Sequence, residues 1–272
     1  MPFPAAATYP ASASYPAVAS YPAVATYPGI DDDAQAFITA AGITDPNQQN
    51  AVNRLTVSLK LAGIWTKMVA IWPIVGGTAS THSYNLTNPA TWQITWVNSP
   101  TQDANGVTFN GSTNYGQVSA AIFSAGVTVS NFSAGVYARV INSLATRSDL
   151  GAYDGSDATR VLIMRTRAGD ANDFVLGGTG YGGPLATSTA GLLAMSVDTT
   201  RKPYINGAAN SSSATGGTMP YTALNMACLA PGIQHSNANL AFAFVGQTLT
   251  AGDQSSLYAI VQPYQVDLGR AV

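Results

Sequence analysis

The chain has 272 residues, of which 9% are charged, and its formal net charge is −2. An average soluble protein carries about 25% charged residues, so Ser, Thr, Asn and Gly must supply most of this surface. All 13 acidic residues are Asp, and no stretch of the sequence is basic. The composition therefore excludes phosphate-backbone binding as a main task, and we expect no nucleic-acid partner. Such low charge also indicates a surface that is covered by neighbouring molecules or that faces a harsh exterior.

Cys228 is the single cysteine, which excludes a disulfide within the chain and a metal site of four thiolates. We expect it to be a small buried apolar residue. No Lys or Arg precedes Arg54, so the first residues lack the basic region of a secretory signal. The longest apolar stretch is interrupted by Lys67 and Pro73 before it reaches about 18 residues, the length of a membrane span. We therefore expect a protein with no membrane partner that folds in a reducing cytoplasm.

An aromatic-proline pair recurs every six residues within residues 1–29, the hexad arm. Each proline lacks an amide hydrogen and forces the preceding residue out of helical geometry, so we expect an extended arm. At about 3.1 Å per residue it could reach roughly 90 Å. The arm cannot bury enough surface to fold alone, so it is a passive tether, an anchor with one ring per pocket, or part of a threefold bundle. The rings expected to dock on a partner belong to Phe3, Tyr9, Tyr15, Tyr21 and Tyr27.

A helical neck is predicted over residues 30–77. In DDDAQAFITAAG, Asp31 to Asp33 supply an N-cap and Gly42 suits the position after the last turn. The next helix starts at Thr44 or Asp45 and ends at Gly63.

One face of this second helix is apolar, and a third short helix is expected from Ile64 to Trp72, before Pro73. Helices this short bury little surface alone, so we expect them to pack on the β domain or on copies of themselves. The residues on the apolar face are Val52, Leu55 and Leu59, with Ala62 as a further candidate.

A β-sandwich is predicted over residues 78–272. The runs WQITWV, FSAGVYARVI, TRVLIMRTR, GLLAMSVD and LAFAFVG read as strands, and turn signals such as Asn206-Gly207 separate them. The Asn206-Gly207 signal predicts a hairpin. Many short strands at regular spacing indicate a mainly β sandwich or jelly roll. One late helix is predicted after this, with Thr250 as its cap, Asp253 three residues later, and Pro263 as its stop.

Two stretches carry a family resemblance. KPYINGAANSSSA and LAFAFVGQTLTAGDQSSLYAIVQPYQVDLGR resemble the closing half of concanavalin A-like (laminin-G-like) jelly-roll modules carried by tailed-bacteriophage virion proteins, through the hairpin and a final strand-helix-strand. The helical segment before them is similar to one that often precedes this module. The resemblance covers roughly residues 31–272 and leaves out the hexad arm. It implies a surface component of a phage head or tail, and no single chemistry.

Glycan cleavage in a sandwich of this type normally uses two carboxylates, and the resembling glucanases use Glu for both. This chain has no Glu, and its candidate Asp residues lie in polar, turn-like sequence with nothing to raise a pKa. We therefore expect no catalytic residue and no enzyme activity. The Asp residues considered are Asp149, Asp154, Asp157, Asp170 and Asp173.

Metal and cofactor sites are not expected either. In SDLGAYDGSD, Asp149, Asp154 and Asp157 could offer oxygen ligands to calcium, but their spacing fits no calcium loop and an ordinary turn is favoured. His82 and His235 have no patterned partners, so each is structural or exposed.

The run GGTGYGG, with Gly178, Gly180 and Gly183, matches a phosphate-binding pattern, but no helix follows it. A flexible surface loop is favoured, in which an exposed Tyr181 could contact a ligand such as a sugar. The four tryptophans are expected to pack in the core.

The sequence as a whole predicts a structural virion protein, a capsid decoration or head fibre. Its arm would attach to a major capsid or tail protein, and its jelly roll would project outward at the virion surface, as a homotrimer. The alternative is a tail-fibre or lectin-like module that binds a host-surface glycan, with the arm as a passive tether.

Overall fold

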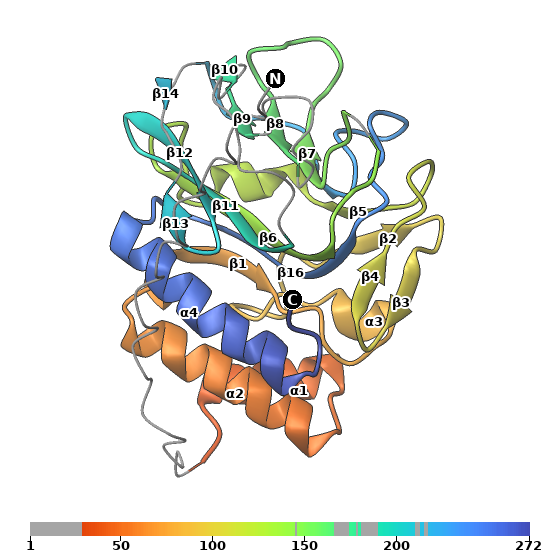
Figure 1. Cartoon of the computed structure of the whole chain (residues 1–272), viewed down its shortest axis with the longest axis vertical. Coiled ribbons are helices and arrows are strands. Elements are labelled where there is room, and N and C mark those ends of the chain that lie inside the picture. Colours follow the sequence, from red (N-terminus) through yellow and green to blue (C-terminus); the bar gives the residue numbers. More distant parts are fainter. Residues whose placement is uncertain are drawn as a thin grey trace, which may run out of the picture.

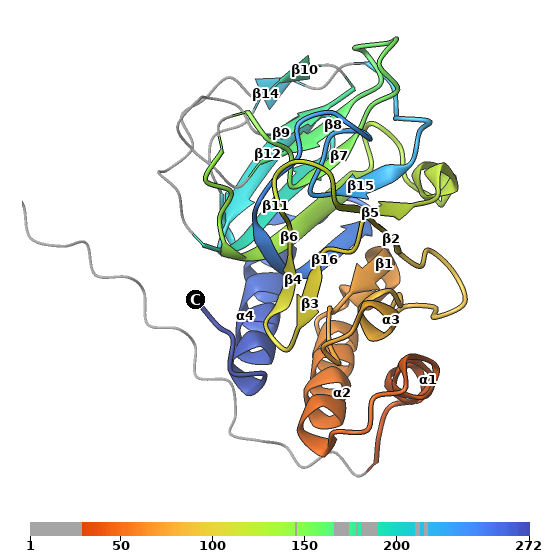
Figure 2. The same cartoon turned by 90° about the vertical axis from the view of Figure 1, so that its right-hand side faces the viewer.

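The computed structural model describes residues 29–144, 146–165, 174–177, 179–180, 190–209, 213–214 and 217–272. The five aromatic residues of the hexad arm and Tyr181 lie outside these described residues. In the described part, two β-sheets face each other, and helices cover the outer face of one sheet (Figures 1 and 2).

The first two helices form where their caps predict them. α1 (Asp32–Ala41) begins after Asp31, whose carboxylate accepts a hydrogen bond from a first-turn N–H, and it ends at Gly42, with φ 69°. α2 (Pro46–Leu61) begins after Asp45, whose carboxylate accepts hydrogen bonds from two N–H groups of its first turn. Both predicted helices are confirmed. They begin at these positions because the capping carboxylates satisfy amide groups that the helix itself leaves unpaired.

The two helices pack on the sandwich, which confirms one of the two predicted arrangements. Phe37 of α1 and Leu55 of α2 share a buried core with Phe242 of the larger sheet. Val52, Leu55 and Leu59 are buried as predicted, whereas Ala62 is exposed because α2 ends at Leu61.

The prediction of a third helix over residues 64–72 is wrong. After a short 3-10 turn, η1 (Trp65–Lys67), the chain forms β1 (Met68–Trp72), which pairs with the larger sheet. Trp72 faces the core between the sheets, and Ile71 faces the core under the helices. A strand buried on both faces lacks the alternation that identifies a half-exposed strand. Residues 30–77 therefore supply one strand of the larger sheet as well as two helices.

Over the described residues, the larger sheet has 9 strands in the order β13-β12-β11-β6-β16-β4-β3, with β1 paired to β16 and β14 to β12. All of these pairs are antiparallel. The strands are β3 (Thr101–Asp103), β4 (Gly106–Thr108), β6 (Phe132–Val140), β11 (Gly191–Val197), β12 (Thr200–Ile205), β13 (Ala208–Ala209), β14 (Ser213–Ala214) and β16 (Asn239–Gly246).

The smaller sheet has 7 strands in the described part of the chain, in the order β10-β9-β8-β7-β15-β5-β2. One of its faces packs on the larger sheet through a core that includes Met164, Phe174 and Met226, and its other face points outward. The strands are β2 (Thr95–Val97), β5 (Tyr115–Val118), β7 (Leu150–Ala152), β8 (Leu162–Met164), β9 (Phe174–Leu176), β10 (Thr179–Gly180) and β15 (Leu224–Met226).

The prediction of a mainly β sandwich is confirmed, because two antiparallel sheets face each other over a shared core. The predicted hairpin is also confirmed. It joins β12 to β13 through Asn206 and Gly207, both with positive φ, 49° and 75°. Two short helices complete the described fold, α3 (Ala79–His82) and η2 (Ala120–Ser124).

The last helix, α4 (Ala251–Asp267), begins as predicted but continues past its predicted stop. Thr250 and Asp253 form the expected capping box. Pro263 lies inside the helix, where Arg54 Nη2 donates a hydrogen bond to its carbonyl oxygen at 3.0 Å. Arg54 also forms an ion pair with Asp267, so contacts with α2 hold the last turns in place. In the described chain no strand follows α4, so the expected final strand is wrong.

A buried arginine holds the residues after α4. Arg270 is 2% exposed, and its guanidinium donates hydrogen bonds to the carbonyl oxygens of Pro73, Ile74 and Ala241 at 2.9, 2.6 and 2.9 Å. These acceptors satisfy a charge that would otherwise be costly to bury. Segments far apart in the sequence are thereby joined at one point.

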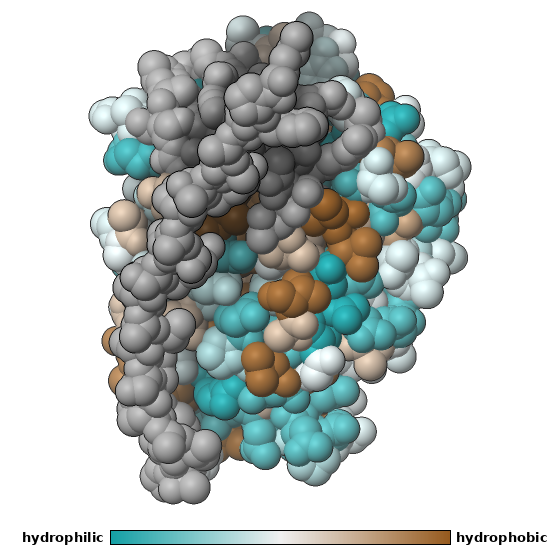
Figure 3. Space-filling model, in the orientation of Figure 1, coloured by the Kyte–Doolittle hydropathy of each residue, from teal (hydrophilic) through white to brown (hydrophobic). Residues whose placement is uncertain are grey.

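The described surface shows no large apolar patch on the face drawn in Figure 3, where apolar residues form small groups among polar ones. Val140, Val266 and Val272 are among the exposed apolar side chains. Scattered apolar residues are ordinary on folded proteins, so a concave site is the better candidate for binding. Among the described helices, none has both the length and the apolar character that a bilayer crossing needs.

Candidate functional site

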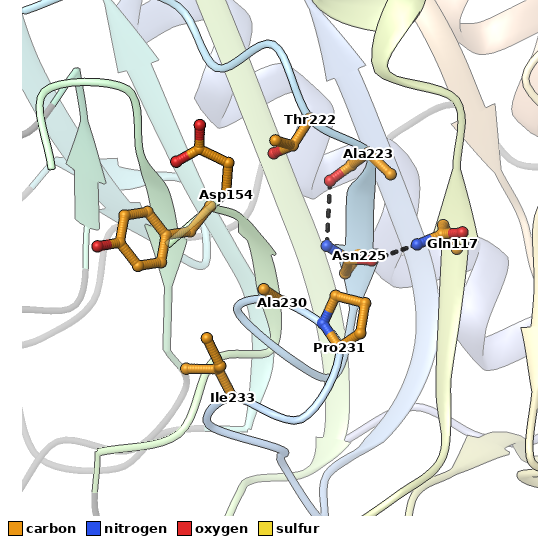
Figure 4. Close-up of a pocket in the computed structure, with 9 residues that line it drawn as sticks. Gln117, Asp154, Thr222, Ala223, Asn225, Ala230, Pro231 and Ile233 are labelled. Atoms are coloured by element: carbon orange, nitrogen blue, oxygen red, sulfur yellow. Dashed lines mark hydrogen bonds between the residues drawn. The ribbon is translucent and has the colours of Figure 1, made fainter. Parts of the chain in front are cut away.

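A cavity of about 400 Å³ opens on the outward face of the smaller sheet, and we call it the outer pocket. Its size falls within the range of roughly 300–1,000 Å³ that is typical of small-ligand sites. Gln117 and Asp154 lie on opposite sides of it, with Thr222 at one rim (Figure 4). The lining residues are Gln117, Tyr153, Asp154, Thr222, Ala223, Asn225, Ala230, Pro231 and Ile233.

The floor of the outer pocket is built by two adjacent strands. Gln117 of β5 and Asn225 of β15 are direct cross-strand partners. Their sequence neighbours Val118 and Leu224 point into the core, so strand alternation turns both amides outward. Gln117 Nε2 donates to Asn225 Oδ1 at 3.3 Å, and Asn225 Nδ2 donates to the carbonyl oxygen of Ala223 at 3.0 Å. This network fixes the orientation of both amides in the floor.

One wall is a tight turn that carries Ala230, Pro231 and Ile233, and it approaches the sheet over Gly151. A Cβ atom at Gly151 would lie 2.6 Å from Leu229 Cα and 2.7 Å from the carbonyl oxygen of Cys228. Real Cβ atoms essentially never come this close to backbone. The absence of a side chain at Gly151 therefore allows the wall to lie where it does.

His235 ties this wall to β5. Its Nε2 accepts a hydrogen bond from the Gly232 N–H at 3.1 Å, and its Nδ1 lies 3.4 Å from the carbonyl oxygen of Asn114. The ring packs edge-on against Tyr115, with centroids 5.8 Å apart. Burial is the main cause that lowers the pKa of His235, so the neutral ring is favoured. His235 is thus a structural residue, one of the two predicted alternatives.

The opposite rim is held by Asp154. Its carboxylate accepts hydrogen bonds from the N–H groups of Ser156 and Asp157 at 2.9 and 3.2 Å. Ser156 Oγ also donates to it at 2.9 Å, and Tyr221 donates its hydroxyl hydrogen from the neighbouring segment. The hydrogen bond from the Ser156 N–H is the largest of the effects that lower the pKa of Asp154, so the carboxylate is ionised at neutral pH.

The side chains of Arg160 and Thr222 complete this rim. The Arg160 guanidinium lies over the Tyr221 ring, 4.9 Å from its centroid, and its Nε is 3.2 Å from a carboxylate oxygen of Asp157. Thr222 Oγ1, in contrast, is buried and has no hydrogen-bond partner among the described residues. Buried hydroxyls are nearly always paired, so we expect this one to turn into the cavity and pair with a ligand's polar group when a ligand binds.

The Asp residues considered for calcium are not brought together. Asp149 is buried and accepts a hydrogen bond from Ser236 Oγ, whereas Asp154 and Asp157 hold the pocket rim. Within the described residues, no group of three or more His, Cys or Asp side chains is placed to hold a metal ion. Asp170, Asp173 and the GGTGYGG glycines Gly178 and Gly183 lie outside the residues described, as does Tyr181.

The other singled-out residues are structural. His82 is buried, with Nε2 accepting from the Gly77 N–H at 3.0 Å and Nδ1 2.6 Å from Gln102 Oε1. Cys228 is buried as predicted, and burial raises its pKa to about 12. Trp72 is fully buried in the core between the sheets, Trp92 and Trp96 are partly buried against that core, and Trp65 is partly buried against the core under the helices.

Sequence reasoning missed the floor of the outer pocket. β15 is three residues long and was not predicted, since its sequence LNM gives too few positions to show a period. The one available signal was Asn225, a polar residue inside the apolar run ALNMACLA. Nothing in the sequence pairs it with Gln117, because strand register is a tertiary property.

No family model and no curated protein matches the sequence. Among solved structures, the chain is similar to domain 4 of an extracellular arabinanase from Geobacillus stearothermophilus, in complex with arabinotriose. That match has 14% identity and a TM-score of 0.49, and it covers 70% of this chain and 98% of that one.

The chain is also similar to a Trypanosoma rangeli sialidase in complex with sialic acid, at 12% identity and a TM-score of 0.48, covering 71% of this chain and 33% of the sialidase. For the binding domain of botulinum neurotoxin serotype D the values are 10% and 0.47, with 72% and 52% covered. These likenesses concern the β-sandwich fold, and the ligands of those proteins are not assigned to this chain.

Proposed function

We propose that this chain is a non-enzymatic carbohydrate-binding module that takes a sugar in the outer pocket. The observation that carries the proposal is the unpaired hydroxyl of Thr222, at the rim of a cavity whose floor is the amide pair of Gln117 and Asn225. A sugar presents hydroxyls that both donate and accept hydrogen bonds, which suits a mixed set of amide, hydroxyl and carbonyl groups. Tyr153 adds an aromatic ring with a polar end.

The absence of enzyme activity is part of the proposal. The chain contains no Glu, and Asp154, the acid that lines the outer pocket, is held ionised by its hydrogen bonds. A glycosidase acid needs a raised pKa and a second carboxylate across the scissile bond. We therefore expect binding without turnover.

A glycan array probed with the full chain tests this function, followed by titration calorimetry with the best glycan. Thr222→Val removes the hydroxyl and keeps the shape, so the affinity is expected to fall about tenfold, in line with the loss of one or two hydrogen bonds. Thr44→Val, at the exposed start of α2, is the matched control and should leave the affinity unchanged. An array with no signal above background would overturn the proposal.

A second function is compatible with the first and rests on the hexad arm. We propose that residues 1–29 anchor the chain, as a homotrimer, to a major capsid or tail protein at a virion surface. The support is the fixed six-residue spacing of the aromatic rings, which a passive tether does not need. The resemblance to phage virion proteins supports it from sequence alone.

Replacement of the four arm tyrosines by Ser tests the anchor. We expect the variant to be lost from particles while its melting temperature stays that of the parent chain, since the two cores of the described fold are built from other residues. The variant residues are Tyr9, Tyr15, Tyr21 and Tyr27. Incorporation at the parent level would show that the arm is a tether.

A further inference from the structure

The outer pocket contains one ionised side chain. Of the described residues that line it, Asp154 alone carries a charge, and the others are apolar or neutral polar. A ligand that enters therefore meets a negative charge on the side opposite Gln117 (Figure 4).

The Asp154 carboxylate is held in one orientation, and it stays ionised at neutral pH. Four protein donors occupy the Asp154 carboxylate: the N–H groups of Ser156 and Asp157, Ser156 Oγ and the Tyr221 hydroxyl. The hydrogen bonds from Ser156 and from the Asp157 N–H keep the pKa of Asp154 below its ordinary value. With its acceptor sites used, the carboxylate acts on a ligand mainly through its charge.

The neighbouring charges do not reverse its sign. Arg160, which lies over the Tyr221 ring at this rim, is already paired with the Asp157 carboxylate at 3.2 Å. Two carboxylates and one guanidinium leave the rim with a net negative charge. Arg165 is not among the lining residues, and its Nη2 donates to Oε1 of Gln234, next to the wall residue Ile233, at 3.0 Å.

We propose that the outer pocket selects uncharged glycans and rejects sugars that carry a carboxylate, such as sialic and uronic acids, with Asp154 as the specificity-determining residue. This inference rests on the proposed carbohydrate binding. A sugar carboxylate beside Asp154 would bring two like charges together and exchange hydration for a pocket whose described lining holds no cation. A neutral sugar in the same place meets no charge repulsion from Asp154.

The test compares matched pairs of glycans that differ by one terminal sialic or uronic acid, measured at low ionic strength with the full chain. We expect the neutral member to bind at least tenfold more tightly than its acidic partner. Asp154→Asn keeps an oxygen that accepts from the Ser156 and Asp157 N–H groups, and it should reduce this ratio to below threefold. Asp157→Asn removes a charge from the same rim, outside the pocket lining, and should leave most of the ratio in place.

The outcomes separate this inference from the function on which it rests. Equal binding of neutral and acidic glycans by the parent chain would overturn the inference and leave carbohydrate binding intact. No binding of any glycan would overturn both. If Asp154→Asn does not fold, salt dependence replaces it: because screening weakens charge repulsion, the ratio should shrink between 0.01 and about 0.5 M salt. If the ratio of neutral to acidic glycan affinity does not change with salt, charge does not set the selectivity.

Discussion

Gly151→Ala is expected to destabilise the protein by about 2–3 kcal/mol and to lower glycan affinity at least tenfold. The new methyl group would lie 2.6 Å from Leu229 Cα, and backbone cannot rotate away as a side chain can. The turn with Pro231 and Ile233 would therefore be pushed from the sheet, and the wall of the outer pocket would move with it. Urea denaturation and calorimetric titration with the best glycan measure the two effects.

Gly252→Ala is the matched control for this substitution. It lies in the first turn of α4, and its nearest neighbour would be 3.8 Å from the added carbon, which is ordinary contact. It should leave the protein as stable as the parent chain or more stable by up to about 1 kcal/mol, since Ala is a better helix former than Gly. If Gly151→Ala were as mild as this control, the turn would not depend on close approach to β7.

The stability of the protein should fall between pH 6.5 and pH 4, by about 3 kcal/mol, through the titration of His82. Burial is the main cause that lowers the pKa of His82 to about 4, and the charge of Arg270 acts in the same direction. Asp103 and the hydrogen bond to Gln102 oppose it. Protonation would also remove the acceptor for the Gly77 N–H.

The sign follows from the order of the two pKa values. The unfolded chain takes up the His82 proton near pH 6.5 and the folded chain only near pH 4, so acid favours the unfolded state across this interval. Carboxylates with lowered pKa, such as Asp198 at about 2, lose their contribution at lower pH, below their unfolded value of 3.8. The loss of stability above pH 4 therefore comes from the histidines and not from these carboxylates.

Urea denaturation at half-unit pH steps measures this slope, and His82→Asn is the variant to compare. The variant should be less stable at pH 7 and should keep a smaller slope that comes from His235, whose pKa is also lowered. A slope equal to that of the parent chain would show that another group is responsible.

Local chemistry made much of this fold predictable. Asp31, Asp45 and Thr250 cap helices through contacts within a few residues, and Asn206-Gly207 closes a hairpin through its own backbone preference. These signals act over short distances, so they can be read without knowledge of the rest of the chain.

The features that sequence reasoning missed depend on distant partners. β1 is a strand because β16 pairs with it and both its faces are covered, and α4 passes Pro263 because Arg54 of α2 holds the last turns. The outer pocket likewise combines β5, β15 and a turn over Gly151, which no local pattern brings together.

The position of β16 has a consequence for how the protein is made. β16 lies between β6 on one edge and β4 and β1 on the other, and Arg270 then joins residues near β1, β16 and α4. During synthesis, β1, β4 and β6 leave the ribosome long before β16. The unpaired edges and apolar faces of these strands therefore stay exposed until β16 is made. Late closure over such sequence distances makes folding slow and favours help from a chaperone during synthesis.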